Sequence, residues 1–452
     1  MKKIAVIASR LKCVDAISIE AERWIDKYRN LGYEVHLISG KFGEPAHLPH
    51  LELPELDYKH PEIRGVKNIT FSAKLDKQGK RAAEILRDNL VKRIKIPLKK
   101  YLTKNNINAL SIEDALISLK NLPLSIALLE IIKETGLPTI SRYHYIPWGN
   151  SYFTKYNNFP KILNNIPLQG KNIIHITNTQ SSREKLLHHR KISAKIIPNT
   201  IDFDKLATID DYNKNFRKEF GITDDQLIFL QPTRVKRNKS VEKSIKIVYE
   251  INQTTKKDNV LIITGSPVYQ RGNYFEAIIR RIDKLGVKVI FANHKIFLSR
   301  HQNKEQKFYS IHDAYVHADF VLYPNVSDAF GNPVIEAAAY RKPIIVSEYP
   351  NLDAIAKKGF RLIRFSQKVD QQTLSDIAEL TFNKDKQKAI TDVNFELAKK
   401  YYSSDALDEH LIPILNSLRP EHSIISKLGR RIRKTFKDDS LKNQKGGYKD
   451  PK

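Results

Sequence analysis

Short apolar runs alternate with stretches of helical periodicity in the N-terminal part of the chain. The apolar run KIAVIAS at 3–9 is followed by apolar residues at helical spacing from Ile17 to Leu31, and then by the run EVHLIS at 34–39. This order, with Gly32 where the helix ends, predicts a strand, a helix and a second strand. Strands that alternate with helices form parallel sheets covered on both faces, so a doubly wound α/β domain is expected. The pattern further predicts a helix at 121–136 and strands at 137–144 and 172–178.

The same alternation starts again after a polar, charged stretch near residues 203–226. It predicts a second doubly wound unit, and therefore an α/β chain of two Rossmann-like domains. The predicted strands lie at 227–233, 259–265, 287–293, 318–325 and 342–349, and the helices at 241–252, 274–286 and 333–340. Ligands of such sheets bind outside the carboxyl ends of the strands, and the main cleft is expected between the two domains.

Length and composition agree with a folded, multidomain chain. Its 452 residues are 41% hydrophobic and 28% charged, which excludes general disorder. Cys13 is the only cysteine, so intrachain disulfides and cysteine-built metal sites are excluded and a cytoplasmic location is expected. No signal-peptide core is completed at the N-terminus, and no window approaches the roughly 20 apolar residues of a membrane span. Any membrane contact is expected to be peripheral.

The charge balance is strongly basic. Lysine and arginine total 77 against 50 acidic residues, a net charge of +27 that favours anionic partners. Much of the excess lies in residues 74–104, with 11 cations and three acids, and in the tail at 420–452. Both segments carry an apolar stripe at helical spacing. The stripes are Ala83, Leu86, Leu90 and Ile94 in the first segment, and Ile425, Leu428, Ile432 and Phe436 in the tail.

The basic segments have two interpretations. In one, they bind peripherally to the anionic inner face of the membrane. In the other, the first stripe packs on its own domain and the tail is solvated. Nucleic acid is disfavoured as a partner, because the stripes lack the interleaved aromatic residues that stack on bases.

The loop between the predicted strand at 318–325 and the helix at 333–340 carries the strongest chemical signal. Backbone amides of Phe330, Gly331 and Asn332 are expected to be free at the helix N-terminus, where anions and polar oxygens bind. Glu336 is expected in the first helical turn, where it can accept hydrogen bonds from a diol. The alternative is structural: Asp328 caps the turn and Glu336 complements the helix dipole.

This loop resembles that of a known family. DAFGNPVIEAAAYRKPIIV, residues 328–346, is similar to the E-x7-E signature of the retaining, nucleotide-sugar-dependent glycosyltransferases of family four. Glu336 matches the second acid of that signature. Asp328 stands at the first position, where the family usually has glutamate.

A second segment, LQPTRVKRNKSVEKSI at 230–245, resembles the G-R-L-x-x-x-K-G segment of the same family. The resemblance implies that Arg234 and Lys239 hold the donor diphosphate, with Thr233 and Ser240 replacing the glycines. Two fixed cations stabilise a departing diphosphate without a metal. The alternative for an isolated pair of cations is a solvated loop. A third segment, SAKIIPNTIDFDK at 193–205, resembles the V-I-P-N-G-I-D connection between the domains.

The N-terminal half resembles mannosylglucosylglycerate synthases more narrowly. The similar segments are 9–43, 121–138 and 140–153, with Ala16 for the usual glycine and Tyr145 for the usual aspartate. The resemblance implies that His144 lies by the donor sugar, and that Asp15, Ser18 and Arg142 are candidates for acceptor contacts. For Asp15 and Ser18 the alternative is capping of the first helix. For His144 it is a structural role.

Together these resemblances imply a metal-independent retaining glycosyltransferase of the GT-B fold. The acceptor-side domain would span 1–203, completed by a helix near 401–418, and the donor domain 204–400. Glu336 would hold the ribose and Asp328 the sugar, with Asp328 and His144 as the catalytic residues. The expected donor is a UDP- or GDP-sugar, no other cofactor is expected, and the acceptor is a hydroxyl of a small glycoside, a glycan or a lipid-linked sugar. A nucleotide-sugar 2-epimerase and a basic nucleic-acid-binding protein are the alternatives.

Overall fold

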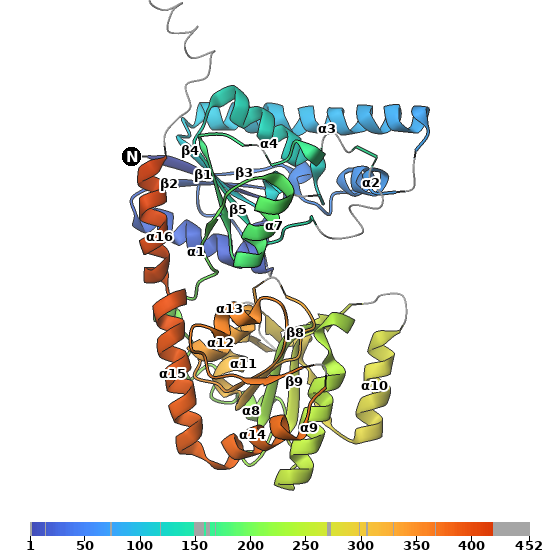
Figure 1. Ribbon diagram of the computed structural model, residues 1–452, viewed down its shortest axis with the longest axis vertical. Helices are drawn as coiled ribbons and strands as arrows, with labels where there is room; N and C mark the ends of the chain where they lie inside the picture. The colour runs from blue at the N-terminus through green and yellow to red at the C-terminus, as the bar shows by residue number, and fades with distance from the viewer. Residues whose placement is uncertain are drawn as a thin grey trace, which may run out of the picture. The chain divides into compact units, whose positions relative to one another are not determined.

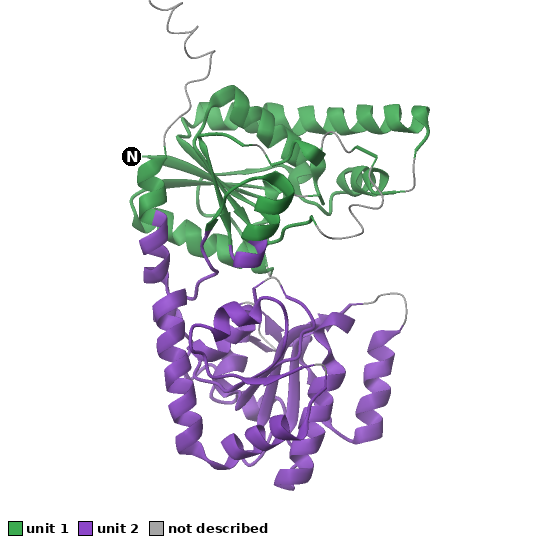
Figure 2. Cartoon of the chain, viewed as in Figure 1, with its two compact units in different colours: residues 1–177, 183–195, 412–452 green, residues 178–182, 196–411 purple. Residues whose placement is uncertain are grey.

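A computed structural model describes most of the chain, which forms two compact units (Figure 2). Unit 1 comprises residues 1–177, 183–195 and 412–452, and unit 2 comprises residues 178–182 and 196–411. The described residues are 2–13, 15–72, 75–117, 119–148, 158–159, 163–167, 169–268, 273–297, 299–303, 306–328, 330–366 and 368–418. The predicted stripe of the basic tail therefore lies outside the described residues.

Unit 1 is built on a seven-stranded sheet of order β3-β2-β1-β4-β5-β6-β7. Its strands are β1 (Lys3–Ala8), β2 (Glu34–Ser39), β3 (His50–Glu52), β4 (Ala109–Glu113), β5 (Thr139–Tyr143), β6 (Ile173–Thr177) and β7 (Lys195–Ile196). The helices are α1 (Ala16–Asn30), α2 (Pro61–Thr70), α3 (Lys77–Lys104), α4 (Leu122–Thr135) and α7 (Gln180–Arg190). The neighbours from β3 to β6 pair in parallel, as the sequence pattern predicts.

Local signals explain where the unit 1 helices begin and end. Asp15 caps α1 by accepting a hydrogen bond from the Ser18 amide, and Asn121 caps α4 in the same way. Gly136 ends α4 with φ of 65°, a left-handed conformation that costs glycine little. Helices α3 and α4 lie on one face of the sheet and α1 on the other (Figure 1).

Helix α3 contains the first basic segment. Of its predicted stripe, Ala83, Leu90 and Ile94 are buried and Leu86 is partly buried in unit 1. Several of its cations pair within the unit, such as Arg93 with Glu55 and Glu62, and Lys95 and Lys99 with Glu134. In the structure, therefore, the apolar stripe of α3 packs on its own domain. Membrane contact stays a prediction, and no helix in the described ranges is long and apolar enough to cross a bilayer.

Unit 2 contains a six-stranded parallel sheet of order β10-β9-β8-β14-β15-β16. Its strands are β8 (Ile228–Val235), β9 (Val260–Pro267), β10 (Lys288–Phe291), β14 (Phe320–Tyr323), β15 (Ile344–Ser347) and β16 (Ile363–Phe365). A small second sheet contains β11 (Ile296–Phe297), β12 (His301–Gln302) and β13 (Lys307–Ser310).

Helices cover both faces of the unit 2 sheet (Figure 1). They are α8 (Phe216–Glu219), α9 (Val241–Thr255), α10 (Tyr274–Leu285), α11 (Ile311–His317), α12 (Asn332–Ala339), α13 (Leu352–Ala356), α14 (Gln371–Phe382) and α15 (Lys384–Tyr402); α16 (Ser404–Ser417) runs from unit 2 into unit 1. Successive strand residues alternate between the two cores: Val321 packs with α11 and α12, whereas Phe320 and Leu322 pack with α9 and α14. This alternation explains why the strands are apolar throughout.

Each of the two large sheets has one position where the order of its strands reverses. In unit 1 the reversal lies between β1 and β4, and in unit 2 it lies between β8 and β14. Connections leave such a pair toward opposite sides, which opens a crevice at the carboxyl ends of the strands where ligands bind. The residues that follow these four strands are therefore placed to contact ligands.

Candidate active site

The loops after β8 and β14 bring two predicted motifs together. Nζ of Lys239 lies 2.9 Å from Oδ2 of Asp328, and both side chains are largely shielded from solvent. Lys239 follows β8 and Asp328 follows β14, so their ion pair lies at the strand-order reversal of unit 2. The cationic and acidic motifs therefore belong to one site.

Asp328 is held by more than Lys239. Its Oδ1 accepts a hydrogen bond from the Phe330 amide at 3.3 Å, and its Oδ2 accepts one from Nδ2 of Asn325 at 3.2 Å. Burial tends to raise the pKa of Asp328, but the charge of Lys239 and the hydrogen bonds outweigh burial and lower that pKa overall. Asp328 is thus a carboxylate at neutral pH, and it also caps its own turn.

The backbone after Asp328 depends on Gly331. This residue precedes α12 with φ of +100°, and a Cβ atom on it would lie 2.0 Å from the hydroxyl oxygen of Tyr349. Only glycine therefore fits this position without movement. Pro333 occupies the first turn of α12, as predicted.

Glu336 does not lie in the first helical turn, contrary to the sequence prediction. Helix α12 begins at Asn332, so Glu336 is past the first 3.6 residues, and the first turn holds no acid. Dipole compensation, which falls off within one turn, is therefore a poor account of Glu336. Instead, the buried hydroxyl of Tyr315, on α11, donates to Oε2 of Glu336 at 2.6 Å.

Arg234 is exposed at the carboxyl end of β8, and it forms no ion pair with the residues that the structure describes. The backbone there is crowded, because a Cβ on Gly265 of β9 would lie 2.5 Å from the Arg234 nitrogen. Ser240 has φ of 46° and a buried side chain, a left-handed conformation that explains why glycine suits this place. Thr233 accepts a hydrogen bond from Gln231 at 3.1 Å.

The connecting segment near residue 200 contacts the same loop. Nδ2 of Asn199 donates to Oδ1 of Asn332 at 2.9 Å, although 133 residues separate them. Asn199 and Thr200 are buried, whereas Asp202 caps a short 3-10 turn at Phe203–Lys205. Asn332 is thereby fixed beside Gly331.

In unit 1, His144 lies in a buried group of charged residues. Its Nε2 is 2.9 Å from Oε2 of Glu113, and its backbone nitrogen donates to Oδ1 of Asp114 at 2.6 Å. Glu113 ends β4, and His144 follows the neighbouring strand β5. Both acids are therefore placed by the sheet, at its carboxyl edge.

The charges in this group shift one another. Burial tends to raise the pKa of Glu113, but Arg142 and His144 lower it overall. Burial tends to lower the pKa of His144, but Glu113 and Asp114 outweigh burial and raise it. Burial raises the pKa of Asp114. The arrangement therefore favours a protonated imidazole beside an ionised Glu113.

Arg142 lies behind this group. It is 2% exposed, bonds Glu113 at 3.1 Å and Glu20 at 3.3 Å, and its guanidinium carbon lies 3.8 Å from the centre of the Trp24 ring. Such a residue positions its neighbours and has no free face for an acceptor. The prediction of an acceptor contact therefore changes to a positioning role.

Asp15 and Ser18 form the cap that the alternative interpretation describes. Oδ1 of Asp15 accepts from the Ser18 amide at 3.1 Å, and the fully buried Ser18 hydroxyl accepts from the Cys13 amide at 2.8 Å. Asp15 nevertheless lines a cavity, whereas Ser18 is not among the described residues that do.

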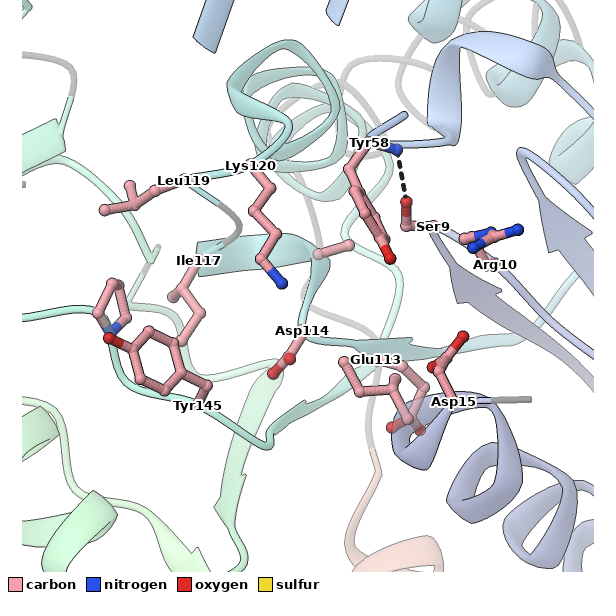
Figure 3. Close-up of a pocket in the computed structure, with 13 residues that line it drawn as sticks. Ser9, Arg10, Asp15, Tyr58, Glu113, Asp114, Ile117, Leu119, Lys120 and Tyr145 are labelled. Carbon is pink, nitrogen blue, oxygen red and sulfur yellow. Dashed lines mark hydrogen bonds between the residues drawn. The ribbon is translucent and has the colours of Figure 1, made fainter. Parts of the chain in front are cut away.

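This cavity, the β1–β4 cavity, opens where the unit 1 strand order reverses (Figure 3). Its polar lining includes Ser9, Arg10, Asp15, Tyr58, Glu113, Asp114, Lys120 and Tyr145. The sequence patterns missed Glu113 and Asp114, because strand β4 was not predicted. The signal in the sequence that could have revealed this strand and its two acids is the short apolar run at 109–112, which Glu113 and Asp114 follow.

A model of the family described as Glycosyl transferases group 1 matches residues 213–394, which include Arg234, Lys239, Asp328 and Glu336. This part of the chain is similar to the group 1 glycosyltransferases. Both residues of the Lys239–Asp328 ion pair thus lie in the matched region.

Two curated relatives extend the likeness beyond the matched region. The chain is 24% identical over 387 residues to the mannosylglucosylglycerate synthase of Petrotoga mobilis, covering 82% of this chain and 88% of the relative. It is 24% identical over 443 residues to the enzyme of that name from Thermotoga maritima, covering 90% and 98%. The predicted resemblance of the N-terminal half is confirmed.

Solved structures show the fold. Anabaena HepE in complex with UDP-glucose is similar with a TM-score of 0.61 and 14% identity, over 92% of this chain and 100% of that one. Sucrose-phosphate synthase from Thermosynechococcus elongatus gives a TM-score of 0.64 at 14% identity, over 92% and 99%. The chain therefore has the predicted two-domain α/β fold of the GT-B class.

Proposed function

We propose that this glycosyltransferase moves a hexose from a nucleotide-diphosphate sugar to a hydroxyl acceptor, with retention of configuration and without a metal. The observation that carries the proposal is the Lys239–Asp328 ion pair at the strand-order reversal of unit 2. It joins a cation suited to a diphosphate with a carboxylate suited to sugar hydroxyls.

Each donor-side residue has a role in this proposal. Arg234 and Lys239 bind the diphosphate and stabilise the negative charge that develops as it leaves, so charge stabilisation needs no metal. Glu336 accepts hydrogen bonds from the ribose through Oε1, while Tyr315 holds Oε2. Asp328 and the amides of Phe330, Gly331 and Asn332 bind the sugar.

His144, from unit 1, contacts the donor sugar in this proposal. With its pKa raised, the imidazolium can donate a hydrogen bond to a sugar oxygen, and Glu113 holds the ring in place. Arg142 and Glu20 fix Glu113 in turn. The group therefore presents one donor at the carboxyl end of β5.

The names of the relatives suggest the substrates to try first. They contain a mannosyl group, a glucosyl group and glycerate, and the solved HepE structure holds UDP-glucose. We infer that UDP- and GDP-hexoses are the donors to test, with the mannose and glucose derivatives first. The glucoside of glycerate is the first acceptor.

The test is a matrix of UDP- and GDP-sugars against acceptors. Nucleotide release is followed with and without acceptor, and the new glycosidic bond is assigned by NMR. The expected result is acceptor-dependent release and a product with the anomeric configuration of the donor. Release that needs no acceptor and yields an epimerised nucleotide sugar favours the 2-epimerase. Transfer that survives exhaustive chelation supports the metal-independent mechanism, and an inverted product contradicts retention.

A further inference from the structure

We propose that the β1–β4 cavity of unit 1 binds a singly charged carboxylate on the acceptor, with Arg10 and Lys120 as its cationic contacts. The inference rests on the proposed function, since it takes unit 1 as the acceptor side. It adds the residues that read the charge of the acceptor.

Arg10 is placed to receive an anion. It follows β1 and lines the cavity, with a side chain that is 16% exposed. Its Nε is buried and has no hydrogen-bond partner in the described part of the chain; Oδ2 of Asp57, the carboxylate in its ion pair, is 3.7 Å away. A buried donor without a partner costs free energy unless a ligand satisfies it.

Lys120 supplies the second cation. It lies between β4 and α4, and its Nζ is 5.1 Å from the centre of the Tyr58 ring. It forms no ion pair among the residues that the structure describes, although Figure 3 shows its amine turned toward the same space as Asp114. Tyr58 is itself fixed, because its amide donates to the Ser9 hydroxyl at 2.9 Å.

The acids of the cavity are already engaged within the protein. Glu113 accepts from Arg142 and His144, Asp114 accepts from the His144 amide, and Asp15 accepts from the Ser18 amide. Although Asp57 and Tyr58 also interact with Arg10, its Nε and the amine of Lys120 are therefore the donors that a ligand is left to satisfy. An anion fits better than a cation.

The number of charges selects the anion. Two cations stand beside three acids in the lining, so a dianion would meet more repulsion than a carboxylate. Arginine also matches the two oxygens of a carboxylate through a planar fork. The hydroxyls of the rest of the acceptor find acceptor oxygens on Asp15 and Asp114.

The test uses three acceptors that carry the same sugar and differ in the charged end group: the glucoside of glycerate, the glucoside of glycerol, and the glucoside of glycerol phosphate. Binding to the full chain is measured by calorimetry with UDP or GDP present, and transfer is measured separately. The wild type should bind the carboxylate at least 10-fold more tightly than the neutral and the dianionic compounds.

Arg10→Gln and Lys120→Met should each weaken binding of the carboxylate about 10- to 100-fold, because each removes a charge-assisted contact, and should weaken binding of the neutral glucoside much less. The matched controls are Arg29→Gln and Lys133→Met, which are exposed and do not line the cavity. Their affinities should equal that of the wild type. Melting temperature and nucleotide affinity confirm that every variant is folded.

Equal binding of the three compounds by the wild type, or unchanged selectivity in both variants, overturns the proposal. Tightest binding of the phosphate, lost in the same variants, overturns the choice of a singly charged ligand. Selective carboxylate binding without transfer to any acceptor supports this inference while contradicting the proposed function. The two failures are therefore distinguishable.

Discussion

Nε2 of His144 lies 2.9 Å from Oε2 of Glu113, and both residues stand at the carboxyl ends of neighbouring strands. Glu113 is 2% exposed and His144 is 9% exposed, so the pair is removed from bulk water. The protonation state of the histidine therefore depends on this carboxylate more than on solvent.

Glu113→Gln should lower the pKa of His144, because burial then acts without the opposing charge. NMR titration of the imidazole, compared with Glu130→Gln on the surface of α4, measures the change. An unchanged pKa of His144 in Glu113→Gln contradicts the assignment.

The same pair predicts a pH dependence of stability. His144 has a folded pKa above its ordinary 6.5, so its stabilising contribution is full below pH 6.5 and is lost as pH rises through the folded pKa. In Glu113→Gln the pKa of His144 in the folded state falls, and the contribution of His144 to stability at low pH changes sign. The difference in unfolding free energy between the wild type and Glu113→Gln should be larger at about pH 5.5 than at about pH 8. Urea unfolding at both pH values measures it, and a constant difference contradicts the pairing.

The proposed contacts of Arg234 and Lys239 with the diphosphate predict large losses of turnover. Arg234→Ala and Lys239→Ala should each lower kcat by about two to three orders of magnitude, since one electrostatic stabiliser of a leaving group is worth about 2.7 to 4 kcal/mol. Arg280→Ala, at an exposed site on α10, is the matched control and should keep full activity. Near-normal turnover in both variants, with an identified donor and acceptor, would falsify the role of these cations.

The two acids should separate in their effects. Asp328→Asn should reduce turnover more than nucleotide binding, whereas Glu336→Gln should weaken binding of the free nucleoside diphosphate. Asp328→Glu restores the family residue and should be the mildest change at that position. Similar small losses for Asp328→Asn and Glu336→Gln in both assays, at unchanged melting temperature, indicate purely structural roles.

Tyr315→Phe tests the orientation of Glu336. The change removes one hydrogen bond to Oε2, and a typical bond contributes about 0.5 to 1.5 kcal/mol, so nucleotide affinity should fall about 2- to 12-fold. At saturating donor, kcat should stay near that of the wild type. In the Glu336→Gln background the same change should have a smaller effect, and full additivity contradicts the coupling.

The periodicity of apolar residues predicted much of the fold, but it predicted only part of the candidate site. Helix α4 was predictable because its apolar spacing and Gly136 agree, whereas β4 is five residues long and carries Ser111 inside an apolar run. Without β4, the sequence offered no way to place Glu113 beside His144. The contact between Tyr315 and Glu336 was not predictable either. Tyr315 lies 21 residues earlier on another helix, and only packing brings the two side chains together.

Gly331 gives the sharpest test of the donor loop, because two independent penalties meet there. Its φ of +100° strains any other residue, and a new Cβ would lie 2.0 Å from the Tyr349 hydroxyl oxygen. Gly331→Ala should therefore lower the free energy of unfolding by about 2 to 4 kcal/mol, and weaken donor binding as Asn332 and α12 shift.

Tyr349→Phe removes the clashing oxygen and loses only a long 3.3 Å hydrogen bond to the Phe330 carbonyl. In a double-mutant cycle it should recover the steric part of the loss and leave the backbone strain, about 1 to 3 kcal/mol. Gly221→Ala is the control for strain alone, since its φ is +61° and no atom lies within 4 Å of the new Cβ. If Tyr349→Phe rescues Gly221→Ala as well as it rescues Gly331→Ala, the contact between Gly331 and Tyr349 does not explain the loss.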